Sequence, residues 1–190
     1  MANKSAIGVA KVDAIEVSTN EEFGLNAKFL HDMLSATDAK DVVIQKKDNG
    51  VIEVKAGRSR WTLVALANVA PTYRAIQEPS FVLGFSEERY KELMARAVPF
   101  IANEETISAF NGLSVIVEGD TCSLYGASRS CVSRQRFKLA EPVAETKTLV
   151  LWRDIAALTL SGDVQWRFTD NTVEVVSGNE RYTMPLLAAT

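Results

Sequence analysis

The chain has 190 residues, of which 47% are hydrophobic and 24% are charged, and its net charge is −3. This balance is typical of a globular protein. It argues against a protein that binds nucleic acid over its whole surface, although one locally basic face stays possible. The two cysteines and the single histidine, His31, are too few for a disulfide framework or a standard structural zinc site. We therefore expect reduced thiols, no metal and no cofactor.

The sequence shows no targeting or membrane segment. The residues after Met1 lack the long apolar core of a signal peptide, and no apolar run reaches the ~18 residues that a membrane-spanning helix needs. We therefore expect a cytoplasmic protein that does not associate with membranes.

Helices are predicted at three places along the chain. The first covers about 26–36, where apolar residues recur at helical spacing. The second begins after Ser86, which can cap a helix, and ends before Pro99. The third covers about 151–160, again with apolar residues at helical spacing.

Strands outnumber helices. Short β-branched or alternating runs that are bounded by turn residues predict strands at 42–45, 51–55, 60–64, 113–118, 122–125, 132–139, 164–168, 172–176 and 181–184. Asp48-Asn49-Gly50 is a strong hairpin signal between the first two of these strands. Several strands for each helix indicate an α+β fold, in which helices pack on one face of antiparallel sheets.

An internal repeat organises these elements. Residues 41–66 align without gaps to 162–187. The identical pairs are Val43/Val164, Glu53/Glu174, Val54/Val175, Gly57/Gly178, Arg60/Arg181, Thr62/Thr183 and Leu66/Leu187. Each copy follows a predicted helix, and the segment at about 80–140 forms a third unit of the same kind. The repeat therefore predicts tandem units of one helix and three strands.

Three short motifs carry a resemblance to a known family. Residues 54–63 (Val-Lys-Ala-Gly-Arg-Ser-Arg-Trp-Thr-Leu), 70–76 (Ala-Pro-Thr-Tyr-Arg-Ala-Ile) and 182–186 (Tyr-Thr-Met-Pro-Leu) resemble segments of the bacterial DNA polymerase III beta sliding clamp. The resemblance implies tandem βαβββ units with antiparallel sheets outside and helices on one face. Three of the family's six units would be present: a partial clamp domain (its second half) at 1–75 and a complete one at 76–190.

The resemblance implies a protein that is not an enzyme. A sliding clamp encircles double-stranded DNA without reading its sequence and tethers DNA polymerase, which raises the polymerase's effective concentration at the template. Cations on the helices that line the ring would touch phosphates loosely. The matching candidates are Lys28, Arg89, Lys91, Arg96 and Arg153. Alternatively, these are ordinary solvated charges on amphipathic helices.

The family also binds hydrophobic peptide motifs of polymerase and clamp loader in a groove beside the interdomain linker. The matching positions are Pro71, Ile76, Met184, Pro185 and Leu186. Apolar side chains at a surface cleft bind a peptide by burial. Alternatively, Ile76 and Leu186 belong to the core and the two prolines mark turns. Since the groove's other wall belongs to the missing half-domain, the pocket is expected to be incomplete.

The short length leaves three functional hypotheses. In the first, the chain is a working clamp that self-associates into a ring or pairs with a full-length clamp. In the second, it is a clamp-derived regulator or decoy that binds replication proteins without encircling DNA. In the third, it is an unrelated β-rich scaffold protein. An unpaired half-domain exposes a strand edge, which favours association in either of the first two cases.

Overall fold

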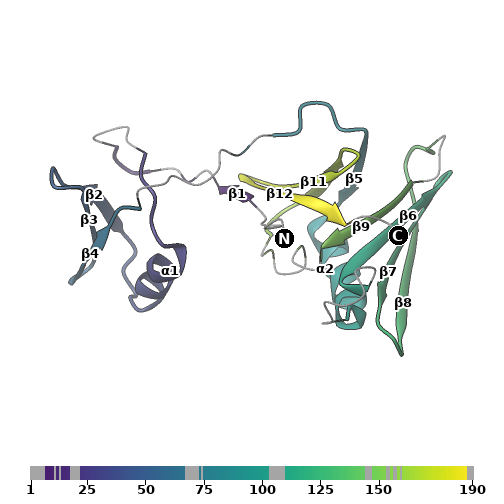
Figure 1. The fold of residues 1–190 in the computed structure, drawn as a ribbon, viewed down its shortest axis with the longest axis horizontal. Helices are drawn as coiled ribbons and strands as arrows, with labels where there is room; N and C mark the ends of the chain where they lie inside the picture. Colours follow the sequence, from purple (N-terminus) through teal and green to yellow (C-terminus); the bar gives the residue numbers. More distant parts are fainter. Residues whose placement is uncertain are drawn as a thin grey trace. The chain divides into compact units, whose positions relative to one another are not determined.

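The computed structural model of the chain describes residues 7–10, 12, 14–17, 22–66, 73, 75–102, 110–143, 147–152, 155, 158 and 160–187. It divides into two compact units (Figure 1). Unit 1 comprises Met1–Asp13 and Tyr73–Thr190, and unit 2 comprises Ala14–Thr72. The sequence places a domain boundary after residue 75, but the first residues belong to unit 1, because strand β1 (Ile7–Ala10) pairs with the last strand of that unit.

Unit 1 consists of two halves, each of which contributes four of the described strands. The first half contains β5 (Phe81–Phe85), α2 (Glu87–Ala97), the 3-10 turn η1 (Val98–Phe100), β6 (Gly112–Glu118), β7 (Thr121–Ala127) and β8 (Val132–Lys138). The second half contains β9 (Lys147–Trp152), β10 (Val164–Phe168), β11 (Thr172–Ser177) and β12 (Glu180–Leu187). Between β9 and β10 only part of the chain is described.

The two halves exchange strands reciprocally. The described strands of unit 1 form one antiparallel sheet in the order β5-β10-β11-β12-β9-β6-β7-β8, with β1 added to β12. The first strand of each half therefore pairs with the second strand of the other half: β5 with β10, and β9 with β6. This exchange joins the halves into a single domain.

The core of unit 1 lies between this sheet and α2. The inward residues of β10, Val164, Trp166 and Phe168, are buried together with the apolar face of α2. Trp166 makes an edge-on contact with Phe85, with ring centroids 5.0 Å apart. The end of α2 also approaches β7 so closely that a Cβ on Gly126 would stand 2.0 Å from the carbonyl oxygen of Ala97. A glycine is therefore required at this strand position.

The described residues of unit 2 form one helix and a three-stranded antiparallel sheet. Helix α1 (Ala27–Ser35) begins at Asn26, whose side chain accepts a hydrogen bond from the backbone N–H of Phe29. Strands β2 (Val42–Lys46), β3 (Val51–Ala56) and β4 (Ser59–Val64) follow in the order β2-β3-β4. An isolated bridge also joins Gly24 to Leu66. Because the buried apolar side chains of this unit all lie on β3, its core is small.

Helices α1 and α2 and all nine predicted strands occur within a few residues of their expected bounds. The third helix is wrong at its start, since Leu151 and Trp152 end strand β9, and most of 153–160 lies outside the described residues. The reason is that the apolar run 149–152 fits a buried strand as well as a buried helix. Strands β1, β5 and β9 were not anticipated from their residues.

The ungapped repeat is confirmed for β3 and β4 and needs a correction in β2. Strands β3 and β4 pair in the same register as β11 and β12, at the predicted offset. In the preceding hairpin, Val42 faces Ala56, whereas Val164 faces Ser177, the counterpart of Ala56. The structural counterparts are therefore Val42/Val164 and Ile44/Trp166, and the Val43/Val164 pair is wrong. The cause is the connecting loop, 47–50, which is one residue longer than 169–171.

Candidate functional site

Helix α2 carries three of the five cations that were predicted to face DNA. Ser86 caps the helix and accepts a hydrogen bond from the backbone N–H of Arg89. One face, with Tyr90, Leu93, Met94 and Ala97, is buried in the core. The charged residues therefore lie on the opposite, solvent-exposed side.

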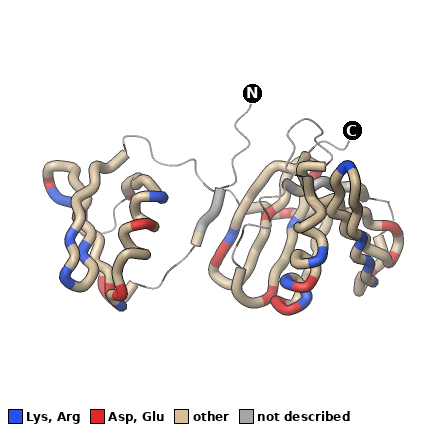
Figure 2. The backbone as a smooth tube through the Cα atoms, turned by 90° about the horizontal axis from the view of Figure 1, so that it is seen from below, with Lys and Arg blue, Asp and Glu red and all other residues tan. Residues whose placement is uncertain are grey.

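Each of these cations is paired with a carboxylate of the same helix. Arg89 and Arg96 share Glu92, with Arg96 Nη2 2.9 Å from Glu92 Oε1. Lys91 pairs with Glu87, and this ion pair, together with a hydrogen bond from the Gly162 backbone N–H, lowers the pKa of Glu87. Helix α2 has three cations and three carboxylates, so its exposed face has no net charge. Figure 2 shows Lys and Arg interspersed with Asp and Glu along both units.

The other two predicted cations are not on α2. Lys28 lies on α1 of unit 2, where its Nζ is 2.7 Å from Asp32 Oδ2. Arg153 lies outside the described residues. The structure therefore groups Arg89, Lys91 and Arg96 on one helix of unit 1, and Lys28 lies on a helix of unit 2.

Sequence reasoning missed a row of cations on strand β8. Arg134, Arg136 and Lys138 alternate along the strand and are exposed on its outer face. Arg134 lies over the ring of Tyr125, 5.4 Å from its centroid, and Lys138 pairs with Asp120. No ion pair is present for Arg136 among the described residues. The period-two spacing of basic residues in an expected strand was the signal that could have revealed this row.

A buried carboxylate lies where the linker meets β11. Glu174 is 0% exposed and accepts hydrogen bonds from the Tyr73 hydroxyl and from Arg167, whose Nη1 is 3.0 Å away. Burial, followed by the hydrogen bond to Glu174, raises the pKa of Tyr73. Glu53, the repeat counterpart, is likewise surrounded by cations, with Lys55 Nζ 2.8 Å from its Oε2. Glu174 thus holds Tyr73, the only described residue between 67 and 74.

The predicted peptide-pocket residues are distributed between core and surface. Met184 is buried in the hydrophobic core, and Leu186 packs against that core and pairs with Leu151. Pro185 and Ile76 are half-buried, and Pro71 lies outside the described residues. Strand β1 pairs with β12 just before this segment, at 180–183.

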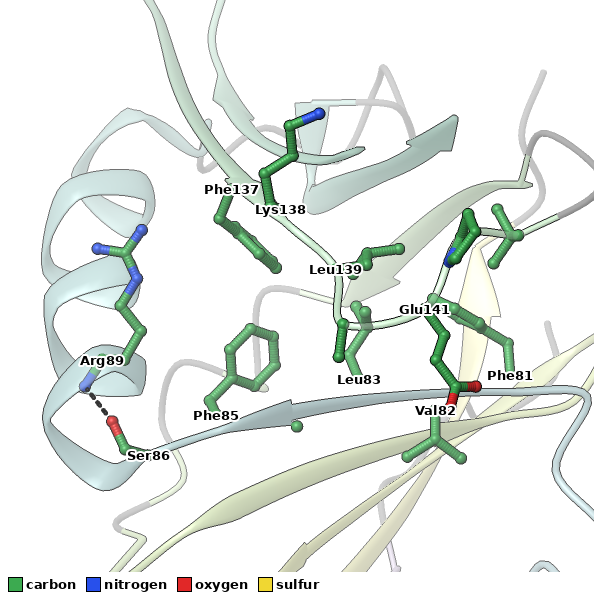
Figure 3. Close-up of a pocket in the computed structure, with 14 residues that line it drawn as sticks. Phe81, Val82, Leu83, Phe85, Ser86, Arg89, Phe137, Lys138, Leu139 and Glu141 are labelled. Carbon is green, nitrogen blue, oxygen red and sulfur yellow. Dashed lines mark hydrogen bonds between the residues drawn. The ribbon is translucent and has the colours of Figure 1, made fainter. Parts of the chain in front are cut away.

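A different groove separates the two edge strands of the unit 1 sheet. It has a volume of about 700 Å³ and lies between β5 and the end of β8 with its following segment, 139–143. Figure 3 shows Phe85, Leu83, Phe137 and Leu139 directed toward its interior. In the second half of unit 1, the corresponding first and last strands, β9 and β12, pair directly. The groove thus lies between β5 and β8, the first and last strands of the first half, which do not pair with each other.

Side chains that bind metal ions do not cluster in the part of the chain that the structure describes. His31 is exposed on α1, and its Nδ1 is 3.6 Å from Asp32. No group of three or more His, Cys, Asp or Glu side chains within the described part of the chain could hold a metal ion. None of the described helices is long and apolar enough to cross a membrane.

Comparison with known proteins gives matches among solved structures. Neither the family models nor the curated proteins include a match to the chain. The DNA polymerase III beta subunit of Thermotoga maritima matches 97% of this chain at a TM-score of 0.84 and 11% identity, over 52% of its own length. That of Pseudomonas aeruginosa matches 97% at a TM-score of 0.81 and 21% identity, over 53% of its length. The sliding clamp of Bacillus subtilis matches 87% at a TM-score of 0.73 and 18% identity, over 45% of its length.

These matches confirm the α+β clamp architecture that the sequence resemblance predicts. They cover nearly all of this chain, whereas the chain spans about half the length of the clamps. The chain has the fold of the DNA polymerase III beta sliding clamps.

Proposed function

We propose that the chain is a DNA clamp component, a non-catalytic processivity factor that surrounds duplex DNA and tethers a polymerase. The observation that carries this proposal is the match of helix-and-strand halves, in order and in space, to beta clamps over 97% of the chain. An unrelated scaffold protein does not account for that match. Ring formation by several copies, or pairing with a full-length clamp, belongs to the proposal.

The exposed face of α2 suits loose contact with DNA. Sliding requires phosphate contacts that form and break easily, and an exposed ion pair contributes only about 0–1 kcal/mol. A phosphate can therefore compete with Glu92 for Arg89 and Arg96, whose side chains are 41% and 60% exposed. Affinity would come mainly from encirclement, with a modest, salt-dependent electrostatic part.

Partner binding is proposed for the surface beside β12. Ile76, Pro185 and Leu186 are half-buried, so each keeps some apolar surface that a hydrophobic peptide of polymerase or clamp loader could cover. Met184 is buried in the core and helps to hold β12 in place. Replacing Met184 would damage the fold, and Ile76→Ser and Pro185→Ser are the better probes of this surface.

The decisive experiment compares retention on circular and linear DNA. A fluorescent chain is loaded onto a nicked plasmid with a clamp loader and passed through a sizing column, before and after the plasmid is cut once. Encirclement predicts that the protein stays with circular DNA and is lost on linearisation. Equal retention on both forms, or on neither, would overturn the clamp proposal.

A second candidate, a clamp-derived regulator that binds replication proteins without encircling DNA, is favoured by the neutral face of α2. It predicts peptide binding that depends on Ile76 and Pro185 together with no retention on circular DNA. Measuring both properties on one preparation separates the two candidates.

A further inference from the structure

Strand β2 exposes the face that should be its core face. Val42 and Ile44 lie opposite Ala56 and Val54, which are buried. Yet Val42 is 41% exposed and Ile44 is 44% exposed. Phe29, on α1 of the same unit, is also largely exposed. On this face of β2, the described residues of unit 2 therefore leave Val42 and Ile44 partly uncovered.

Unit 1 shows what covers the same positions when a domain is complete. The counterparts of Val42 and Ile44 are Val164, which is 1% exposed, and Trp166, which is 0% exposed. Strand β5 covers them by pairing with β10, which places Phe85 opposite Val164 and Leu83 opposite Trp166. Tyr90 of α2 adds a ring contact to Trp166. The cover thus consists of the first strand and the helix of another half.

Unit 2 has the elements of such a half, and each of them has one edge without a described partner strand. The bridge between Gly24 and Leu66 corresponds to the pair of Val150 and Leu187, so the segment at 22–25 is the counterpart of β9. In unit 1, β9 also pairs with β6 of the other half. Among the described strands, β2 pairs only with β3, and the segment at 22–25 has no bridge other than that to Leu66.

We propose that a second copy of this chain completes unit 2. Two copies of the unit pack around a twofold axis, and β2 of each pairs with the segment at 22–25 of the other, as β10 pairs with β5 and β6 with β9. Ile44 and Val42 of both copies then belong to a shared core. A contact of this kind is self-complementary, as in most homodimers. It requires the clamp fold and is independent of whether the protein encircles DNA.

Ile44 and Val43 provide a matched pair of variants. They are neighbours on β2, on opposite faces, and Val43 is 56% exposed on the outer side. The mass of the full chain is measured by light scattering over a range of concentrations without DNA. The wild type and Val43→Lys are expected to show twice the chain mass. Ile44→Lys is expected to show the mass of one chain, because the lysine would have to be buried in the shared core.

A second measurement uses only the wild type, so its result does not depend on whether Ile44→Lys folds. Hydrogen exchange of the β2 amides should slow as protein concentration rises, while exchange in β7 stays constant. A single-chain mass at every concentration, or a dimer that Ile44→Lys leaves intact, would overturn the proposal. So would a complex formed with a three-domain clamp in the absence of self-association. Retention on circular DNA is measured separately: a chain that forms this dimer but is retained equally on circular and linear DNA, or on neither, fails the clamp proposal alone, whereas a chain that is retained on circular DNA although Ile44→Lys leaves its mass unchanged fails this proposal alone.

Discussion

Cys122 is the clearest titratable group within the core of unit 1. It is fully buried on β7, and burial raises the pKa of its thiol from 9.0 to about 12. In the unfolded chain the thiol loses its proton at lower pH than in the folded protein. The unfolded state therefore binds fewer protons between pH 9 and 12, and stability falls as the pH rises through that window.

We therefore expect Cys122→Ala to flatten the pH dependence of unfolding. In the wild type this thiol contributes a loss of about 1.4 kcal/mol for each pH unit above 9. The variant starts from a lower stability, because a buried side chain is shortened, but its free energy of unfolding declines less steeply. Urea titrations at pH 8, 9, 10 and 11 measure both slopes. Cys131→Ala, at an exposed position, should reproduce the wild-type slope, and equal slopes for both variants would contradict the assignment.

Single residues also set the limit of what sequence could predict. The repeat pairs Glu53 with Glu174, and both are clustered with cations in the structure. The hydrogen bond from Tyr73 to Glu174 could not be predicted, because it joins residues far apart in sequence. Burial of Met184 was missed for a related reason: its environment is created by the sheet around it and not by its neighbours in the chain.

At the scale of elements, α2 is a helix whose charges neutralise one another. Glu92 holds two arginines, whereas Glu88, on the same helix, makes no ion pair among the described residues. Glu92→Gln should therefore strengthen binding to duplex DNA at low salt. The slope of log K against the logarithm of salt concentration should become steeper by roughly 1 for each arginine released.

Glu88→Gln provides the control, because it changes the net charge equally and frees no arginine. Fluorescence anisotropy with a short duplex at several salt concentrations measures both variants. If the two variants behave alike, then only overall charge matters and Arg89 and Arg96 do not meet DNA individually.

Turn chemistry explains which elements the sequence could predict. Apart from β8, the strands found correctly lie next to Gly- or Asn-containing turns, such as the one at Gly57, whose φ of 59° suits glycine. The first strands of the halves, β5 and β9, lack such turn residues on one or both sides. Their apolar residues fit either a strand or a helix. The one-residue slip in β2 arose because loop length, and not residue identity, fixes register in a hairpin.

At the scale of the molecule, the two units differ greatly in the amount of core that they contain. The hydrophobic cluster of unit 1 draws on both of its halves, whereas the buried apolar residues of unit 2 are Ile52, Val54 and Ala56. A domain that buries little apolar surface is marginally stable. The clamp fold itself was predictable from the repeat and its motifs, but the unequal completeness of the units in space emerged only from the strand pairings.

We therefore expect two unfolding transitions in dilute solution. Unit 2, whose only tryptophan is Trp61, should unfold first, and unit 1, with the buried Trp166, should unfold at higher denaturant. Trp61→Phe removes the first fluorescence change and keeps the second. A single transition, unchanged in midpoint between Trp61→Phe and the wild type, would show that the units unfold together. The first midpoint should rise with protein concentration if a second copy covers unit 2.

The pairing of β1 with β12 has a mechanical consequence. These strands come from near the two ends of the described chain, and Ile7 lies opposite Thr183 while Ala10 lies opposite Glu180. Tension applied at residues 7 and 187 pulls both strands from the same end, so their hydrogen bonds break one after another, as in a zipper. Strand β1 should therefore separate from β12 at low force, before tension reaches the core of either unit.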